Sequence, residues 1–222
     1  MRRTIAKASL LTALNLLFFA LIGTAVLAIT YRLTHDPIAR SEEMEKLKLI
    51  AQIAPAGSYD NDIIRDTTEL GPDELLGNDT ATPAYLGRLN GVPSIVVMQV
   101  IAPDGYGGKI HMVIAIHSNG RIAGVRVVSD KETPGLGDYI EIAKSKWING
   151  FAGKALDNPD AGGWKVKKDG GVFDYMAGAT ITPRAVVKAV HNALQYYALH
   201  REILFKAHAS TAQAEKVKGE QQ

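Results

Sequence analysis

The chain of 222 residues allows one domain of ordinary size with appendages and excludes a large multidomain enzyme. Its 25 Lys and Arg residues nearly balance its 23 Asp and Glu residues, so it lacks the basic field expected of a nucleic-acid-binding protein. Because the chain contains no cysteine, thiolate-bound iron–sulfur clusters, CxxCH haem attachment, dithiol chemistry and disulfides are all excluded.

Residues 8–30 form an uncharged run of 23 residues. As a helix this run would extend roughly 35 Å, enough to cross a hydrocarbon core. A buried core helix would not be apolar on every face over this length. A cleaved signal peptide is the closer alternative, but its apolar region is typically about 7 to 15 residues long, and no A-x-A site follows the run here. The sequence therefore predicts an uncleaved transmembrane helix over residues 8–31.

Arg2, Arg3 and Lys7 precede this helix. The positive-inside rule then predicts a cytoplasmic N-terminus over residues 1–7 and export of everything after Tyr31. Pro37 is expected to close the span. Residues 32–90 are read as a connecting helix over 38–53, followed by a Gly- and Pro-rich first part of the exported domain.

Three strand-like runs follow, at residues 94–101, 109–117 and 120–128, separated by glycine-containing turns, and they predict an antiparallel meander. Helices are expected over 138–151 and 183–206. The predicted fold is α+β, with a small antiparallel sheet covered by helices in a domain over residues 91–206. The polar tail, residues 207–222, contains no aromatic residue and is predicted to be disordered.

The segment DYMAGATITP, residues 174–183, lies directly before the last predicted helix. Thr182 suits the N-cap and Pro183 the first helical position, which places Thr180 beside a helix N-terminus. Free backbone N–H groups there favour a phosphate, and the small residues Gly178 and Ala179 let a ligand approach the backbone. The residues alone leave open the alternative of an ordinary turn with a threonine cap.

No metal-binding spacing is present among the six histidines, and no P-loop, G-x-S-x-G or Rossmann fingerprint occurs. We therefore expect neither a metal site nor catalytic side chains.

Several longer motifs nevertheless match one family in order. They are the single N-terminal span, APDGYGGKI (102–110), KETPGLGDYIE (131–141), WINGFAGK (147–154), WKVKKDGGVFD (164–174) and GATITPRAVVKAV (178–190). With these motifs the chain resembles the G subunit of the Rnf (Rsx) electron transport complex, a relative of the C subunit of the sodium-translocating NADH:quinone reductase.

The resemblance implies that one FMN is held covalently by a phosphoester to Thr180, within a motif that begins at Asp174 and includes Gly178 and Ala179. It also implies that the isoalloxazine ring is lined by Glu132, Thr133, Leu136 and Gly137. From its charge, Lys168 is expected to offset the phosphodiester charge, with a solvated basic pair of Lys167 and Lys168 beside a loop as the alternative. Tyr106 is placed equally well near the ring or in ordinary packing, and Trp147 is expected in the core.

In this family a separate flavin transferase attaches FMN from FAD and recognises the motif that contains Asp174. This chain departs from the pattern at Ala177, where the family usually has Ser or Thr. The departure keeps open the alternative of a cofactor-free scaffold anchored in the membrane.

The resemblance further implies an electron-transfer subunit that acts with other membrane and peripheral subunits, rather than a free-standing enzyme. Such a complex couples electron transfer between ferredoxin and NAD to ion movement. The expected location is the bacterial inner membrane, where the span contacts lipid and the main domain is periplasmic. The C subunit of a quinone reductase remains an alternative identity from the sequence alone.

Overall fold

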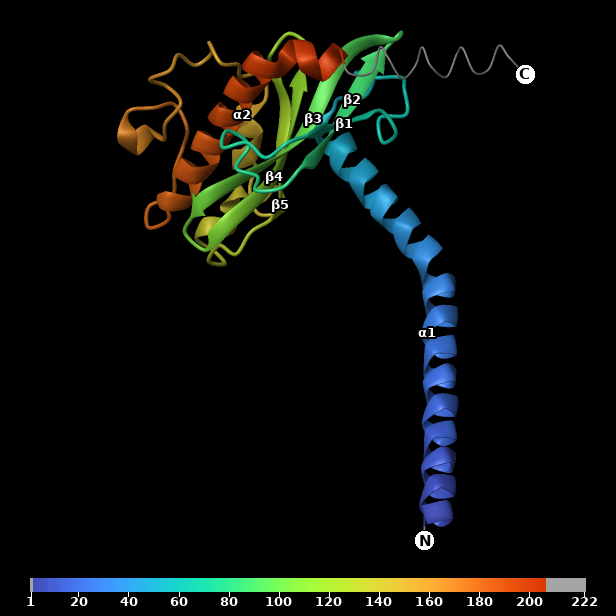
Figure 1. Cartoon of the computed structure of the whole chain (residues 1–222). Helices are drawn as coiled ribbons and strands as arrows, with labels where there is room; N and C mark the ends of the chain where they lie inside the picture. Colours follow the sequence, from blue (N-terminus) through green and yellow to red (C-terminus); the bar gives the residue numbers. More distant parts are fainter. Residues whose placement is uncertain (1, 207–222) are drawn as a thin grey trace, which may run out of the picture. The chain divides into compact units, whose positions relative to one another are not determined.

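The N-terminal part of the chain is one long helix. The computed structural model describes residues 2–206, and the chain divides into two compact units, residues 1–46 and 47–222. Helix α1 runs from Arg2 to Ile53 (Figure 1). Its segment Ala13–Tyr31, 19 residues with a mean hydropathy of 2.2, has none of its residues buried in the structure. A helix this long and this apolar is a candidate membrane span, as the sequence predicts.

Pro37 does not end this helix, contrary to the expectation from the sequence. The helical backbone continues through Pro37 to Ile53, so the predicted connecting helix is the second half of α1. A proline inside a helix removes one backbone hydrogen bond, and the remaining bonds can carry the helix past it. The predicted tail over residues 207–222 lies outside the described residues.

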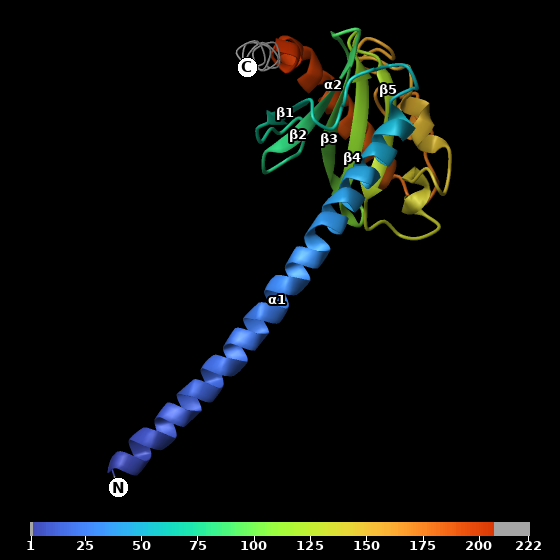
Figure 2. The ribbon, with the colours of Figure 1, turned by 90° about the vertical axis from the view of Figure 1, so that its right-hand side faces the viewer.

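The second unit is built on a five-stranded antiparallel sheet whose spatial order follows the sequence, β1-β2-β3-β4-β5 (Figures 1 and 2). Its strands are β1 (Thr67–Leu70), β2 (Thr82–Leu89), β3 (Val92–Gly105), β4 (Gly108–His117) and β5 (Ile122–Ser129). Every neighbouring pair is antiparallel, which makes the sheet a meander. The predicted meander is thus confirmed and extended by two strands.

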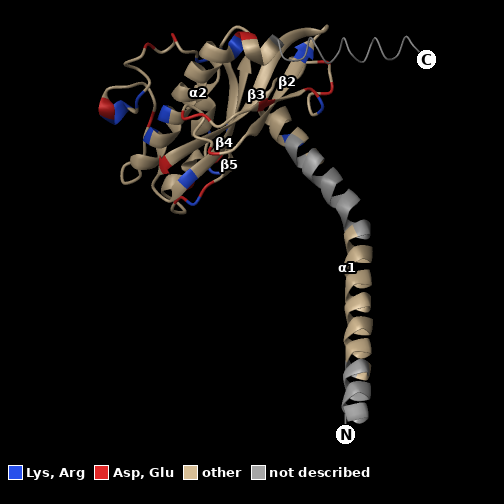
Figure 3. Ribbon diagram, in the orientation of Figure 1, with Lys and Arg blue, Asp and Glu red and all other residues tan. Residues whose placement is uncertain are grey.

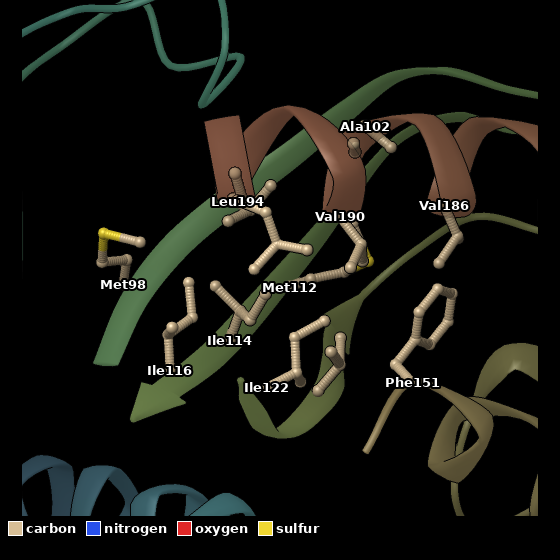
Figure 4. Packing of buried hydrophobic residues seen from close by; sticks show 14 of the residues in the cluster. Met98, Ala102, Met112, Ile114, Ile116, Ile122, Phe151, Val186, Val190 and Leu194 are labelled. Carbon is tan, nitrogen blue, oxygen red and sulfur yellow. The ribbon is translucent and has the colours of Figure 1, made fainter. Parts of the chain in front are cut away.

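Helix α2 (Ile181–Lys206) covers one face of this sheet. Figure 4 shows Val186, Val190 and Leu194 of α2 directed toward side chains of β3 and β4, among them Met98 and Ile114. Met98 and Ile114 are paired across β3 and β4, and alternate residues of both strands point to this face. The main core therefore lies between α2 and the sheet.

The opposite face of the sheet carries a second, smaller core. Ile95 and Val97 of β3 and Ala115 of β4 contact Ile50 and Ile53, which belong to the last turns of α1 within the second unit. Because β3 and β4 are buried on both faces, they read as nearly continuous apolar runs. In Figure 3 charged residues lie mostly in loops and on the outer side of α2.

Two of the five strands, β1 and β2, were not expected from the sequence. β1 has only four residues, and β2 contains Pro83 and Gly87, both of which weaken a strand pattern. A bulge between Gly87 and Arg88 shifts the pairing of β2 with β3. β2 pairs with the longer strand β3, and β1 pairs with β2. This pairing stabilises the two strands although their local sequences favour them only weakly.

The prediction of a helix over residues 138–151 is wrong. The structure has two short 3-10 helices instead, η1 (Gly137–Ile140) and η2 (Trp147–Phe151), joined by turns. Glu141 leaves η1 with an extended backbone, and the Ser145 hydroxyl donates to the Tyr139 carbonyl while it accepts from the Trp147 N–H. A serine that bonds local backbone in this way competes with helix formation.

Helix α2 begins at Ile181, two residues before the predicted start. The N–H of Arg184 donates to the carbonyl of Thr180 at 3.4 Å, so Thr180 holds the N-cap position and Thr182 lies inside the first turn. The prediction that Thr182 caps the helix is therefore wrong. The fold itself is α+β, an antiparallel sheet covered by helices, as predicted.

Candidate functional site

A cavity of about 250 Å³ lies in the second unit, where three segments meet. These are the turn between β3 and β4, the loop that follows β5, and the start of α2. The residues that line the cavity are Tyr106, Glu132, Thr133, Leu136, Gly137, Gly178, Ala179, Thr180, Ile181 and Thr182.

The cavity brings together seven of the eight site residues that the sequence predicts. They are Glu132, Thr133, Leu136, Gly137, Gly178, Ala179 and Thr180. The two groups are separated by about 40 residues of chain, and folding places them at one opening. Tyr106, for which the sequence left two interpretations, also lines the cavity and is 69% exposed.

Thr180 stands at the mouth of this cavity, in the N-cap position of a 26-residue helix. Gly178 precedes it with a φ of +88°, a conformation that side chains with a Cβ rarely adopt. Ala179 then donates its N–H to the Met176 carbonyl at 3.1 Å, which closes a tight turn before the helix. The Thr180 side chain is half-buried rather than enclosed, so its hydroxyl can be reached from outside.

The start of α2 suits a phosphate ester on that hydroxyl. The first backbone N–H groups of a helix have no partner within the helix, and the helix dipole adds partial positive charge there. Pro183 in the first turn has no N–H to leave unpaired. The Thr180 hydroxyl therefore lies at a helix end of the kind that suits a phosphate.

Glu132 forms the buried floor of the cavity and is only 6% exposed. Its Oε1 accepts the N–H of Gly107 at 3.0 Å, and its Oε2 accepts the hydroxyl of Thr182 at 2.6 Å. Both oxygens are thus partnered, as a buried carboxylate requires. Glu132 links the β3–β4 turn to the first turn of α2.

Gly137 leaves space that a side chain would fill. A Cβ built at Gly137 would lie 2.6 Å from Oε2 of Glu132 and 3.1 Å from Oγ1 of Thr182. Gly107 is equally constrained, since a Cβ there would lie 1.9 Å from the Lys131 carbonyl oxygen. The glycines let three backbone segments close around one cavity.

The size and lining of the cavity fit part of a flavin. Enclosed small-molecule sites usually measure about 300–1,000 Å³, so a cavity of about 250 Å³ would hold part of an FMN and leave the rest at the surface. Leu136 and Ile181 supply exposed apolar surface at the rim. Partial exposure suits a cofactor that must exchange electrons with another protein.

Lys168 is the one predicted site residue that does not line this cavity. It lies in the 3-10 helix η3 (Lys167–Asp169), none of whose residues is buried. The neighbouring Lys167 forms an ion pair with Asp174 at 2.5 Å, and both side chains are exposed. Lys168 is therefore a surface residue, outside the lining of the cavity.

An aromatic group supports the segment that leads to Thr180. The Trp147 indole donates its N–H to the Asp174 carbonyl at 2.9 Å and packs edge-on against Tyr139 and Phe151. Trp147 packs against the main core, as the sequence predicts. Burial raises the pKa of Tyr139 to about 12, so its hydroxyl stays neutral at physiological pH.

Sequence reasoning missed the role of Thr182 and the lining by Ile181. Both directly follow the predicted attachment residue in the GATITP segment, but the sequence pattern indicated only a helix cap at Thr182. No local signal shows that a hydroxyl will meet a carboxylate 50 residues away in the chain. Only the folded arrangement reveals that pair.

Comparisons with known proteins agree with this arrangement. Residues 105–195 match the FMN-binding domain family, and residues 1–53 match the RnfG N-terminal region. The FMN-binding match contains every residue that lines the cavity.

Similar proteins, each named as the G subunit of an ion-translocating oxidoreductase complex, match almost the whole chain. One from Pseudomonas aeruginosa is 48% identical over 198 residues, which cover 89% of this chain and 92% of that protein. One from Aliivibrio fischeri is 44% identical over 204 residues, covering 92% of this chain and 95% of that protein. One from Shewanella oneidensis is 42% identical over 205 residues, covering 92% of this chain and 95% of that protein.

The names of these relatives favour the Rnf assignment over the alternative of a quinone-reductase C subunit. Identity at this level over nine-tenths of the chain establishes the family. The chain belongs to the RnfG family, the G subunits of ion-translocating oxidoreductase complexes.

Proposed function

We propose that this protein is the subunit of an Rnf-type complex that relays electrons through one FMN, bound covalently to Thr180 by a phosphoester. The observation that carries this proposal is the position of the Thr180 hydroxyl. It lies at the N-terminal end of α2 and lines the same cavity as Glu132, Thr133, Leu136 and Gly137. The complex would couple electron transfer between ferredoxin and NAD to ion movement.

The residues of the cavity have separate tasks in this proposal. Thr180 and the start of α2 hold the phosphate, while Gly178 and Ala179 keep the approach to the backbone open. Leu136 and Tyr106 offer apolar and aromatic surface to the ring. The flavin supplies the redox chemistry when bound, and the protein sets its position and exposure.

Attachment requires a second protein. In the proposed reaction a flavin transferase positions FAD so that Oγ1 of Thr180 attacks the phosphorus of the FMN half. The pyrophosphate bond breaks, AMP leaves, and the hydroxyl proton passes to a base of the transferase or to water. The partly exposed Thr180 and the exposed Asp174 suit recognition by such an enzyme.

Ala177 bears on this attachment. It stands where the family usually has Ser or Thr, and its side chain is exposed beside Gly178. Thr180, Gly178, Ala179 and Asp174 are retained, and Thr180 is the attacking group. Loss of the hydroxyl at position 177 is therefore expected to leave attachment intact, whereas a cofactor-free scaffold would carry no flavin at all.

We also propose that the main domain is periplasmic. Arg2, Arg3 and Lys7 precede the candidate span Ala13–Tyr31, so the positive-inside rule keeps the short N-terminus in the cytoplasm. A covalent link would prevent loss of the cofactor in a compartment that has no flavin pool. The span contacts lipid and holds the domain beside the other subunits of an inner-membrane complex.

Coexpression with a flavin transferase tests the proposal. The parent chain, denatured and run on a gel, should carry flavin fluorescence that withstands denaturation. Thr180→Val should lose this fluorescence, while Thr68→Val, which removes a hydroxyl of β1 that does not line the cavity, should keep it. A parent chain without fluorescence would instead support the anchored scaffold.

A further inference from the structure

The carboxylate of Glu132 connects two segments that lie 25 and 50 residues away in the chain. We propose that Glu132 and Thr182 form a clamp that holds the flavin cavity at its working width and keeps the potential of the bound flavin low. The clamp consists of Glu132, Thr182 and the backbone N–H of Gly107. Its action on a flavin rests on the proposed function, whereas its action on the cavity does not.

Burial makes these hydrogen bonds difficult to replace. Thr182 is 1% exposed and Glu132 is 6% exposed, so water does not readily substitute for a lost partner. A buried polar group that loses its partner pays the full cost of desolvation, and the cost is greater for a charged group. Removal of the Thr182 hydroxyl therefore frees Oε2 of Glu132, and the carboxylate must shift or admit water.

The surrounding glycines show how closely the clamp is packed. A Cβ at Gly137 would lie 2.6 Å from Oε2, and a Cβ at Gly105 would lie 2.9 Å from Oε1. Backbone therefore contacts the carboxylate from two sides. A shift of the Glu132 side chain must move the β3–β4 turn, the loop at Gly137, or the first turn of α2.

The direction of the hydrogen bond at Thr182 determines what the floor can offer a ligand. Thr182 donates its only hydroxyl hydrogen to Glu132, so only lone pairs remain for the cavity. Glu132 likewise presents acceptors alone. Among the described residues that line the cavity, none is Lys or Arg. The floor therefore suits a ligand N–H group, such as the imide N–H of a flavin ring.

The same floor acts on the redox state. Reduction adds electrons to the ring, and a nearby carboxylate without a neighbouring cation disfavours the added negative charge. Glu132 should therefore lower the midpoint potential of the bound flavin. A glutamine at this position keeps one oxygen for the Gly107 N–H and offers an amide N–H to the Thr182 oxygen, so it removes the charge while it retains the geometry.

Amide hydrogen exchange on the full chain, produced without a transferase, tests the clamp itself. Thr182→Val should raise exchange at the Gly107 amide by about tenfold, the effect of one lost hydrogen bond of typical strength. Thr182→Ser, which keeps the hydroxyl, should exchange like the parent. Thr68→Val is a matched control, because the buried Thr68 hydroxyl in β1 has no partner among the described residues. Unchanged exchange at Gly107 in Thr182→Val would overturn the clamp.

The midpoint potential of the flavinylated protein tests the second effect. Glu132→Gln should raise the potential, whereas Thr68→Val should leave it at the parent value. An unchanged potential in Glu132→Gln would overturn the electrostatic role. Absence of flavin on the parent chain would contradict both that role and the proposed function, while the exchange experiment would still decide the clamp.

Discussion

Gly137 has no room for a side chain, because a Cβ there would meet the Glu132 carboxylate at 2.6 Å. Gly137→Ala should therefore destabilise the fold by about 1–3 kcal/mol, the usual cost of overpacking a closed site. The matched control is Gly150→Ala, since a Cβ at Gly150 meets nothing within 4 Å. Denaturant unfolding of both variants measures the difference. Equal stability of the two would show that the loop at Gly137 yields without cost.

His191 gives the fold a pH dependence. It stacks on Trp164 with ring centroids 5.2 Å apart, and burial lowers its pKa below the ordinary value of about 6.5. The unfolded chain therefore takes up a proton first as the pH falls, so this contribution to stability is present above about pH 6.5 and is lost as the pH falls further. Burial also lowers the pKa of His117, so this residue changes the stability with pH in the same direction.

His191→Phe keeps an aromatic ring against Trp164 and removes the titration. We expect its melting temperature to fall less than that of the parent between about pH 7.5 and 5.5. His117 remains in the variant, so part of the decline should persist. Thermal unfolding monitored by circular dichroism provides the measurement, and parallel declines in both proteins would show that His191 does not contribute.

For single residues, the family motifs predict most of the candidate site, whereas the local chemistry of the residues predicts only part of it. A threonine beside a helix N-terminus and two small neighbours are readable locally, and Thr180 does occupy the N-cap position. The pattern assigns the cap to Thr182 because that residue also fits it, yet the Thr182 hydroxyl bonds Glu132 instead. Lys168 is selected for its charge, but charge alone does not show which way a surface loop turns.

At the scale of elements, α2 carries one buried and one exposed face. Leu194 is 1% exposed and packs in the main core, whereas Leu199 on the same helix is 73% exposed. Leu194→Ala should destabilise the domain by about 2–5 kcal/mol, from lost burial and the cavity left behind. Leu199→Ala should change stability by no more than about 0.5 kcal/mol. Chemical denaturation would compare the two, and a similar cost for both would contradict the packing in Figure 4.

Long, strongly patterned elements are the ones that the sequence predicts. Strands β3 and β4 are buried on both faces and therefore read as continuous apolar runs. The four-residue β1 and the proline-containing β2 depend on their pairing with a neighbour, which no local window contains. After β5 the sequence predicts a helix that the structure lacks. Its helix-forming residues lie in two short 3-10 helices, and the Ser145 hydroxyl bonds the backbone between them.

At the scale of the whole molecule, the proposal requires the two ends of the span to lie on opposite sides of the membrane. The chain has no natural cysteine, which provides a clean background for labelling. The variant Ala56→Cys, at an exposed position in the second unit, should react with a membrane-impermeant maleimide in intact spheroplasts. The variant Thr4→Cys should react only after the membrane is broken. The reverse pattern would place the flavin domain in the cytoplasm.

The proposed function depends on a single bond, the phosphoester between FMN and the Thr180 hydroxyl. Mass spectrometry of the peptide that spans residues 174–184, taken from native membranes, shows whether this bond exists. We expect the peptide to carry the added mass of esterified FMN, with fragmentation assigning that mass to Thr180. An unmodified peptide from purified native protein would contradict the phosphoester and leave an anchored protein without a covalent flavin.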